Sequence, residues 1–121
     1  MRIYLIGFMG AGKTEVGRRL AERLGMPFVD LDSEIELQTE MKVRQIFESR
    51  GDPAFRSLEQ EVLRRVSTGP EAADAVIATG GGTFAHEANA RLIRSHGLSV
   101  FLNPAFGTIV QRIGGMGKTA L

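Results

Sequence analysis

The chain of 121 residues contains no cysteine and only two histidines. Without cysteine it cannot build a disulfide scaffold, a thiolate zinc site or a cysteine nucleophile, and two histidines argue against a multi-histidine metal site. Neither sign of charge dominates, because fifteen lysines and arginines balance fourteen aspartates and glutamates. This balance argues against a broad nucleic-acid or membrane surface and favours a small-molecule partner.

Long apolar runs are also lacking. The apolar start "MRIYLIGFMGAG" is interrupted by "KTEVGRR", after a run far too short to span a bilayer. We therefore expect a soluble, cytoplasmic protein that acts as a monomer. The length fits one domain over residues 1–121 and is too short for two.

Apolar runs of strand length alternate with stretches of helical spacing. Near-continuous apolar runs at 2–7 and 75–80, with shorter ones at 27–32 and 98–103, are typical of parallel strands covered on both faces. Helical patterns lie between them, and "AFGTIVQRI" at 105–113 is expected to begin a further helix. The sequence predicts an α/β fold, with an open, mainly parallel sheet and helices on both faces.

Glycine, proline and short polar residues mark the expected helix ends. Gly25 is expected to end the first helix, and Ser33 with Glu36 is expected to form a capping box that begins the second. Gly51 suits another helix end, and Pro53 suits the first turn of the helix that follows.

The strongest functional pattern is "GFMGAGKT" at 7–14, which fits G-x-x-x-x-G-K-[ST] between a predicted strand and a predicted helix. The backbone of Gly10, Ala11 and Gly12 can curl around an anion at the positive end of the helix. Lys13 is expected to reach the β- and γ-phosphates of a nucleotide, and Thr14 to bind Mg²⁺. The sequence therefore predicts a phosphate-binding loop.

A second "GKT" at 117–119 fails the same test. Counting back from Gly117, the place of the leading glycine is taken by Arg112, and the segment before it has a helical pattern. We interpret this stretch as a mobile connector in which Gly114, Gly115 and Gly117 act as hinges.

Asp30 and Asp32 are two residues apart at the expected carboxyl end of a strand. Their side chains should point the same way, toward the crevice where open α/β sheets bind ligands. One carboxylate could act on a metal shell while the other accepts a proton from a hydroxyl nucleophile. Ordinary helix capping before Glu34 and Glu36 is the alternative.

Two further patterns are weaker when taken alone. Arg56 and Glu59 lie three apart on one helical face, where the arginine could grip a carboxylate, although this spacing is also typical of a solvated surface pair. Gly80, Gly81 and Gly82 follow a predicted strand and could admit a ligand close to the backbone, although a bare turn explains them almost as well.

Together, these elements resemble the shikimate kinase family. The matching segments are "GFMGAGKT", "FVDLDSEIE" at 28–36, "IFESRGDPAFRSLEQEVL" at 46–63 and "ATGGGTF" at 78–84, so the similarity covers nearly the whole chain. The resemblance implies a P-loop kinase that transfers a phosphate from ATP, with Mg²⁺, to the 3-hydroxyl of shikimate.

The resemblance also implies a role for each matching residue. Asp32 would hold the acceptor hydroxyl and act as base, Lys13 would act in catalysis at the phosphates, and Asp30 would act on Mg²⁺ through water. Arg56 would grip the shikimate carboxylate. Glu59 would orient Arg56, and Gly80, Gly81 and Gly82 would line the substrate ring. Phe47 and Phe55 would form walls of the substrate pocket. Arg112 would lie near the adenine.

The region from about residue 112 lies where the family has a mobile lid over ATP. Family members have an arginine followed by Pro-Leu there, whereas this chain has Lys118, Thr119, Ala120 and Leu121. Members also continue with a fifth strand, a final helix and a second carboxylate-binding arginine, so we expect the domain to be incomplete at its C-terminus. Two alternatives are a gluconate or nucleoside-monophosphate kinase and a nucleotide-binding module without turnover.

Overall fold

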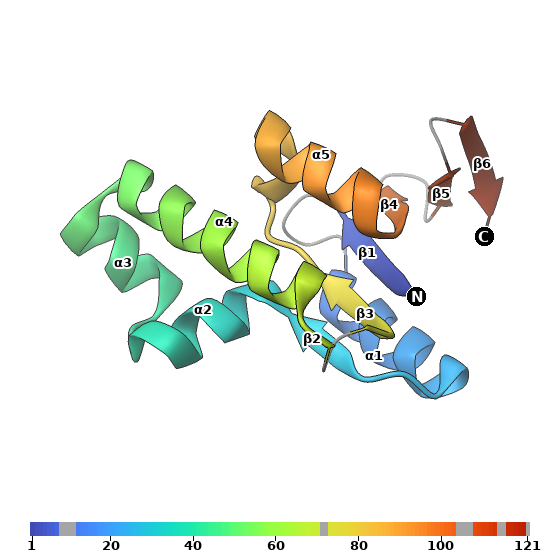
Figure 1. Cartoon of the computed structure of the whole chain (residues 1–121), viewed down its shortest axis with the longest axis horizontal. Helices are drawn as coiled ribbons and strands as arrows, with labels where there is room; N and C mark the ends of the chain where they lie inside the picture. The colour runs from blue at the N-terminus through green and yellow to red at the C-terminus, as the bar shows by residue number, and fades with distance from the viewer. Residues whose placement is uncertain (8–11, 71–72, 104–107, 114–115, 121) are drawn as a thin grey trace.

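The computed structural model describes residues 1–7, 12–70, 73–103, 108–113 and 116–120, with side chains as far as Leu102. Its centre is one six-stranded sheet with the order β2-β3-β1-β4-β5-β6 (Figure 1). The strands are β1 (Arg2–Ile6), β2 (Phe28–Asp30), β3 (Ala75–Ala78), β4 (Leu98–Asn103), β5 (Thr108–Ile113) and β6 (Met116–Ala120).

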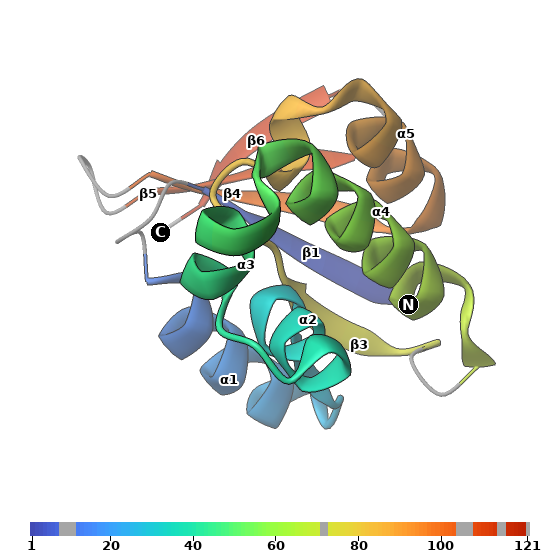
Figure 2. The same cartoon turned by 90° about the vertical axis from the view of Figure 1, so that its left-hand side faces the viewer.

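Five α-helices and a short 3₁₀ helix accompany the sheet in the part of the chain that the structure describes. They are α1 (Lys13–Leu24), α2 (Leu31–Thr39), α3 (Val43–Arg50), α4 (Asp52–Thr68), η2 (Thr83–Ala85) and α5 (Glu87–His96). Helix α1 covers one face of the sheet, whereas α4 and α5 cover the other (Figure 2). Within the described ranges, no helix is long and apolar enough to cross a membrane.

The predicted parallel sheet with helices on both faces is confirmed for the first four strands. Strand β1 pairs in parallel with β3 and β4, and β2 pairs in parallel with β3. Tyr4 and Ile6 face the core under α2, α4 and α5, while Ile3 and Leu5 face the core under α1. Because both sides of the strand are buried, its sequence is apolar at every position rather than at alternate ones.

Helix α1 ends where the sequence predicts, because Gly25 adopts the left-handed conformation at φ 66° that halts a helix. Val16 and Leu20 pack against the core on this face, whereas Leu24 is exposed. Close packing continues at Gly17, where an added Cβ would come within 2.3 Å of the Phe28 ring. The buried face of α1 therefore includes Val16, Gly17 and Leu20 and does not reach Leu24.

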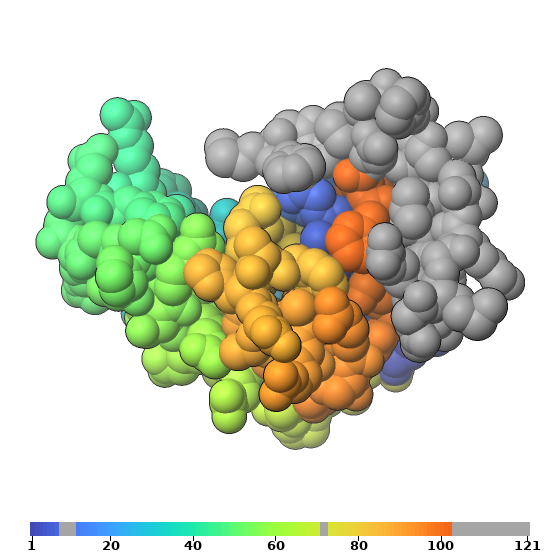
Figure 3. All heavy atoms as spheres, turned by 90° about the horizontal axis from the view of Figure 1, so that it is seen from above, coloured from blue at the N-terminus to red at the C-terminus, as the bar shows by residue number. Residues whose placement is uncertain are grey.

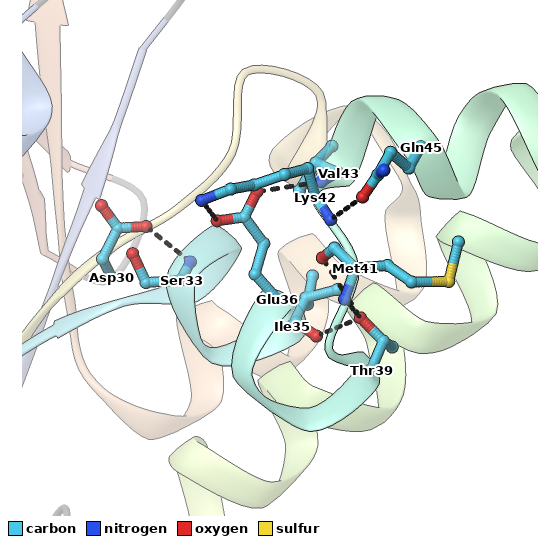
Figure 4. Close-up of polar contacts among 9 residues, drawn as sticks. All are labelled: Asp30, Ser33, Ile35, Glu36, Thr39, Met41, Lys42, Val43 and Gln45. Atoms are coloured by element: carbon cyan, nitrogen blue, oxygen red, sulfur yellow. Dashed lines mark hydrogen bonds and ion pairs between the residues drawn. The ribbon is translucent and has the colours of Figure 1, made fainter.

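The capping box predicted for Ser33 and Glu36 is wrong. Helix α2 begins earlier, and the Asp30 carboxylate caps it by accepting a hydrogen bond from the Ser33 amide at 3.2 Å. Glu36 instead accepts a hydrogen bond from the Val43 amide at 2.9 Å, with Lys42 Nζ 3.9 Å away (Figure 4). Glu36 thereby fastens the first turn of α3 to α2.

The helix predicted at 105–113 is also wrong for residues 108–113, while 105–107 lie outside the described residues. Residues 108–113 form β5, which pairs antiparallel with β4, and 116–120 form β6, which pairs antiparallel with β5. The β-branched residues Thr108, Ile109 and Val110 favour a strand, and the open edge of β4 supplies a partner for it. Of the hinges expected in this stretch, Gly117 lies in β6, while Gly114 and Gly115 lie outside the described residues.

Candidate active site

The segment from β1 into α1 carries the predicted phosphate-binding loop. Gly12 adopts the left-handed conformation at φ 81° immediately before α1, and the Lys13 ammonium donates to the carbonyl of Gly7. Gly10 and Ala11 lie outside the described residues. The first amides of α1 point toward the carboxyl end of the parallel strands, where the helix dipole favours an anion.

Asp30 connects this segment to the next one. Its Oδ2 accepts a hydrogen bond from Thr14 Oγ1 at 3.2 Å, while its Oδ1 caps α2. Strand β2 ends at Asp30, so Asp32 lies in the first turn of α2 and not on the strand. Strand alternation therefore does not align the two carboxylates, contrary to the prediction. Both carboxylates nevertheless act on Lys13, where their charges oppose the lowering of its pKa by burial.

Asp32 is the most perturbed carboxyl group of the site. Burial first, and then the negative charges of Asp30, Glu59 and Glu36, together raise its pKa to about 6 against the opposing charge of Lys13. Its Oδ1 is buried and accepts no hydrogen bond from the described residues. A carboxylate that has a pKa near neutrality and lines a cavity can accept a proton from a bound hydroxyl.

Arg56 and Glu59 form the opposite wall, on α4. Arg56 Nη1 donates to Glu59 Oε1 at 3.0 Å, and the Glu59 side chain is only 1% exposed. The guanidinium also lies 5.3 Å from the Phe55 ring centre and 5.8 Å from that of Phe47, and the two rings stack at 4.4 Å. Because the Glu59 side chain is buried, Arg56 and Glu59 are not a solvated surface pair. This favours the interpretation in which Arg56 binds a carboxylate.

The glycines after β3 are needed for close approach. An added Cβ on Gly80 would come 3.2 Å from Asp32 Oδ1 and 3.4 Å from Glu59 Oε2. On Gly82 it would come 2.9 Å from Arg56 Nη2. Side chains from α2 and α4 therefore pack directly against this stretch of backbone, which is more than a bare turn.

These groups surround one cavity of about 660 Å³. A hollow separates the green α3 region from the yellow segment near residue 80 (Figure 3). The lining residues are Asp32, Val43, Phe47, Phe55, Arg56, Glu59, Gly80, Gly81 and Gly82. Every residue predicted for substrate contact lies in this lining, which joins three segments far apart in the sequence.

The sequence did not predict two residues at the site, and one predicted residue has its side chain outside the described part of the structure. Val43 lines the cavity but was not predicted, although its spacing of four from Phe47 places both on one face of α3. Thr83, directly after the glycines, is fully buried and was also missed. Arg112 lies in β5, and its side chain is outside the described part of the structure.

Oxygen atoms suited to Mg²⁺ meet at the entrance to α1. The described residues hold no cluster of three or more metal-ligating His, Cys, Asp or Glu side chains. The hydroxyl of Thr14 and the carboxylate of Asp30 are nevertheless within 3.2 Å of each other. Because Mg²⁺ often takes one or two protein oxygens and completes its shell with phosphates and waters, this pair fits such an ion.

The comparisons with known proteins agree with this arrangement. The family model described as shikimate kinase matches residues 9–121. The chain belongs to the shikimate kinase family. It is 46% identical to the shikimate kinase of Ruegeria pomeroyi over 111 residues, which are 92% of this chain and 55% of that protein. It is 43% identical to that of Aquifex aeolicus over 112 residues, covering 93% and 65%.

Solved structures of shikimate kinases have the same fold. The crystal structure from Aquifex aeolicus aligns with a TM-score of 0.79 at 45% identity, covering 85% of this chain and 63% of that one. The shikimate kinase from Acinetobacter baumannii in complex with shikimate aligns with a TM-score of 0.78 at 44% identity, covering 84% and 55%. The chain thus spans between about half and two thirds of the length of these relatives.

Proposed function

We propose that the protein transfers the γ-phosphate of ATP to the 3-hydroxyl of shikimate. The observation that carries this proposal is the single cavity that holds the half-buried Asp32 carboxylate together with the Arg56 guanidinium. One group is suited to an acceptor hydroxyl and the other to a carboxylate. Membership of the shikimate kinase family, and the solved relative in complex with shikimate, support the same substrate.

Asp32 acts as the base in this proposal. As the hydroxyl oxygen of shikimate forms a bond to the γ-phosphorus, its proton passes to Asp32. The bond between the γ-phosphorus and the oxygen that bridges to the β-phosphate breaks, and ADP leaves. With a pKa of about 6, the carboxylate is mostly ionised at pH 7 and remains basic enough to take the proton.

Lys13 and the start of α1 hold the phosphates in place. The ammonium lies beside Gly7 at the beginning of the loop, where it can meet the β- and γ-phosphate oxygens. Thr14 and Asp30 would hold Mg²⁺, Asp30 through a water molecule. The ion supplies positive charge to the phosphate oxygens when bound.

Arg56 receives the carboxylate of the substrate. Its guanidinium is held by Glu59 on one side and by the Phe47 and Phe55 rings on another, so little rotational freedom remains to be lost on binding. The aromatic rings and Val43 offer an apolar wall to the carbon ring of shikimate, and the backbone of Gly80–Gly82 faces it.

The test is an acceptor panel with the full-length protein, ATP and Mg²⁺. We expect ADP to form with shikimate and not with gluconate or a nucleoside monophosphate, and phosphorus NMR to identify the phosphate on the 3-hydroxyl. ADP formation with another acceptor would assign a different small-molecule kinase. Nucleotide binding without product from any acceptor would assign a binding module.

A further inference from the structure

Thr83 lies between the two walls of the cavity, although it does not line it. It is the first residue of η2, directly after the glycines, and it is fully buried. Its hydroxyl oxygen accepts a hydrogen bond from the Gly80 amide at 2.9 Å. The same oxygen lies 2.7 Å from Glu59 Oε2.

The direction of each hydrogen bond is fixed by chemistry. The Gly80 amide can only donate, so the single hydroxyl proton of Thr83 is available for Glu59, whose Oε2 accepts it. The other carboxylate oxygen, Oε1, accepts from Arg56 Nη1 at 3.0 Å. An unbroken chain of hydrogen bonds therefore runs from the Gly80 amide through Thr83 and Glu59 to Arg56.

The two ends of this chain of hydrogen bonds lie at Asp32 and at Arg56, the two groups that would hold opposite ends of one substrate molecule. At one end, Gly80 packs so closely that an added Cβ would lie 3.2 Å from Asp32 Oδ1. At the other end is the Arg56 guanidinium. The Thr83 backbone is itself anchored, because the buried Asn89, in the first turn of α5, donates from Nδ2 to its carbonyl at 3.1 Å.

We propose that Thr83 is a positioning residue that fixes the spacing between Arg56 and the Gly80–Gly82 backbone. Through Glu59 it holds the guanidinium, and through Gly80 it holds the backbone beside Asp32. One substrate molecule can then meet Arg56 with its carboxylate and Asp32 with its hydroxyl at the same time. This inference rests on the proposed function, which supplies the identity of the substrate.

The test compares Thr83→Val with Thr83→Ser in the full-length protein. Valine keeps the shape but removes the hydroxyl, whereas serine keeps the hydroxyl. For Thr83→Val we expect the KM for shikimate to rise about tenfold and kcat to fall, because a buried hydrogen bond to a charged group is lost. The KM for ATP should stay within about twofold, and Thr83→Ser should behave like the parent.

A double-mutant cycle separates positioning from general structural support. If Thr83 acts through Glu59, Thr83→Val should change the KM for shikimate much less in a Glu59→Gln background than in the parent. Should the two losses simply multiply, or should Thr83→Val raise both KM values equally, the inference is overturned. Thr83→Ala, which is smaller and brings no clash, replaces the valine variant if that variant fails to fold.

Crystal structures of the unliganded parent and Thr83→Val provide a readout that needs no activity. We expect the Arg56 guanidinium to leave its 3.0 Å contact with Glu59, or to lose order, in the variant. An unchanged guanidinium overturns the inference even if the parent is active. An inactive parent with a displaced Arg56 in the variant refutes the proposed function and leaves the positioning role of Thr83 supported.

Discussion

The hydroxyl of Thr14 and the carboxylate of Asp30 lie 3.2 Å apart, joining the first turn of α1 to the end of β2. If this pair holds Mg²⁺ as proposed, Asp30→Asn should raise the Mg²⁺ concentration needed for half-maximal activity by about 10- to 100-fold. Titration of Mg²⁺ at saturating ATP and shikimate measures this.

Asparagine is the informative substitute at this position because Asn caps helices about as well as Asp. The cap from Asp30 to the Ser33 amide should therefore survive, and the urea midpoint should hardly move. An unchanged Mg²⁺ requirement with unchanged stability would limit Asp30 to capping α2.

Lys13→Ala should weaken ADP binding by at least about tenfold, because a charge-assisted contact to phosphate is lost. Isothermal calorimetry with ADP measures the effect. Lys42→Ala is the matched control, since the Lys42 side chain is 79% exposed and its ammonium lies 3.9 Å from Glu36. Equal affinities in both variants would refute the phosphate-loop assignment.

Asp32→Asn should lower kcat by about 10²- to 10⁴-fold if Asp32 is the base, because the amide keeps the shape but cannot accept the proton. ADP affinity, measured in parallel, should remain close to that of the parent. A near-normal rate would make Asp32 a group that positions the hydroxyl, which a loose phosphoryl-transfer transition state permits.

Asp32→Asn should also change how the stability of the unliganded protein depends on pH. The folded protein keeps the Asp32 proton up to about pH 6, whereas the unfolded chain releases it near the ordinary pKa of 3.8. At low pH, Asp32 therefore does not lower the free energy of unfolding. Its destabilising effect on the folded protein grows as the pH rises from about 3.8 to about 6.

Since the asparagine variant never pays this cost, it should be more stable than the parent by about 1 to 2 kcal/mol at pH 7.5, once solvent screening of the half-buried group is allowed for. The difference should be small near pH 4 and vanish as the pH falls below the ordinary pKa of 3.8. Urea unfolding of both proteins in EDTA, without nucleotide, tests this, and a difference that grows toward low pH would contradict it.

Gly82→Ala should raise the KM for shikimate by about tenfold with little loss of stability. The new Cβ would come 2.9 Å from Arg56 Nη2, which is the movable end of a long side chain, so the guanidinium shifts and the fold does not. Steady-state kinetics and thermal unfolding measure the two quantities.

Gly97→Ala provides the contrast to Gly82→Ala. There the new Cβ would meet the backbone oxygen of Arg2 at 2.2 Å, so the sheet itself must move. We expect this variant to lose stability whether or not its kinetics change. Equal losses of stability in the two variants would show that Gly82 serves only the fold.

Local patterns predicted the parts of the fold that are decided locally. The apolar strands β1 and β3 and the Gly25 helix end were identified because burial on two faces and a left-handed terminus leave clear marks on a sequence. The start of α2 was not identified correctly, because Asp30 and Ser33 are both good helix caps. Only the position at which β2 ends selects Asp30. Strand β5 was missed although its β-branched residues favour a strand, because only its pairing with β4 decides between strand and helix.

The candidate site was predictable as a set of residues and not as an arrangement. From residues alone, Arg56 and Glu59 were more typical of a solvated surface pair than of a binding site, and only the folded structure shows that Glu59 is buried and bonded to Thr83. Thr83 carried no signal of its own, because a buried hydroxyl has meaning only once both of its partners are known. The family resemblance supplied what the local patterns could not.

Strand β1 divides its side chains between two cores, Tyr4 and Ile6 on one face and Ile3 and Leu5 on the other, and runs straight into the loop at Gly7. A single residue inserted into β1 would turn each following side chain to the opposite face of the sheet. Each core would then receive side chains that fit the other core, and the loop at Gly7 would begin on the wrong face. If the loop that follows Gly7 holds phosphate as proposed, natural variation in length should therefore fall in the connections at the amino ends of the parallel strands, away from that loop.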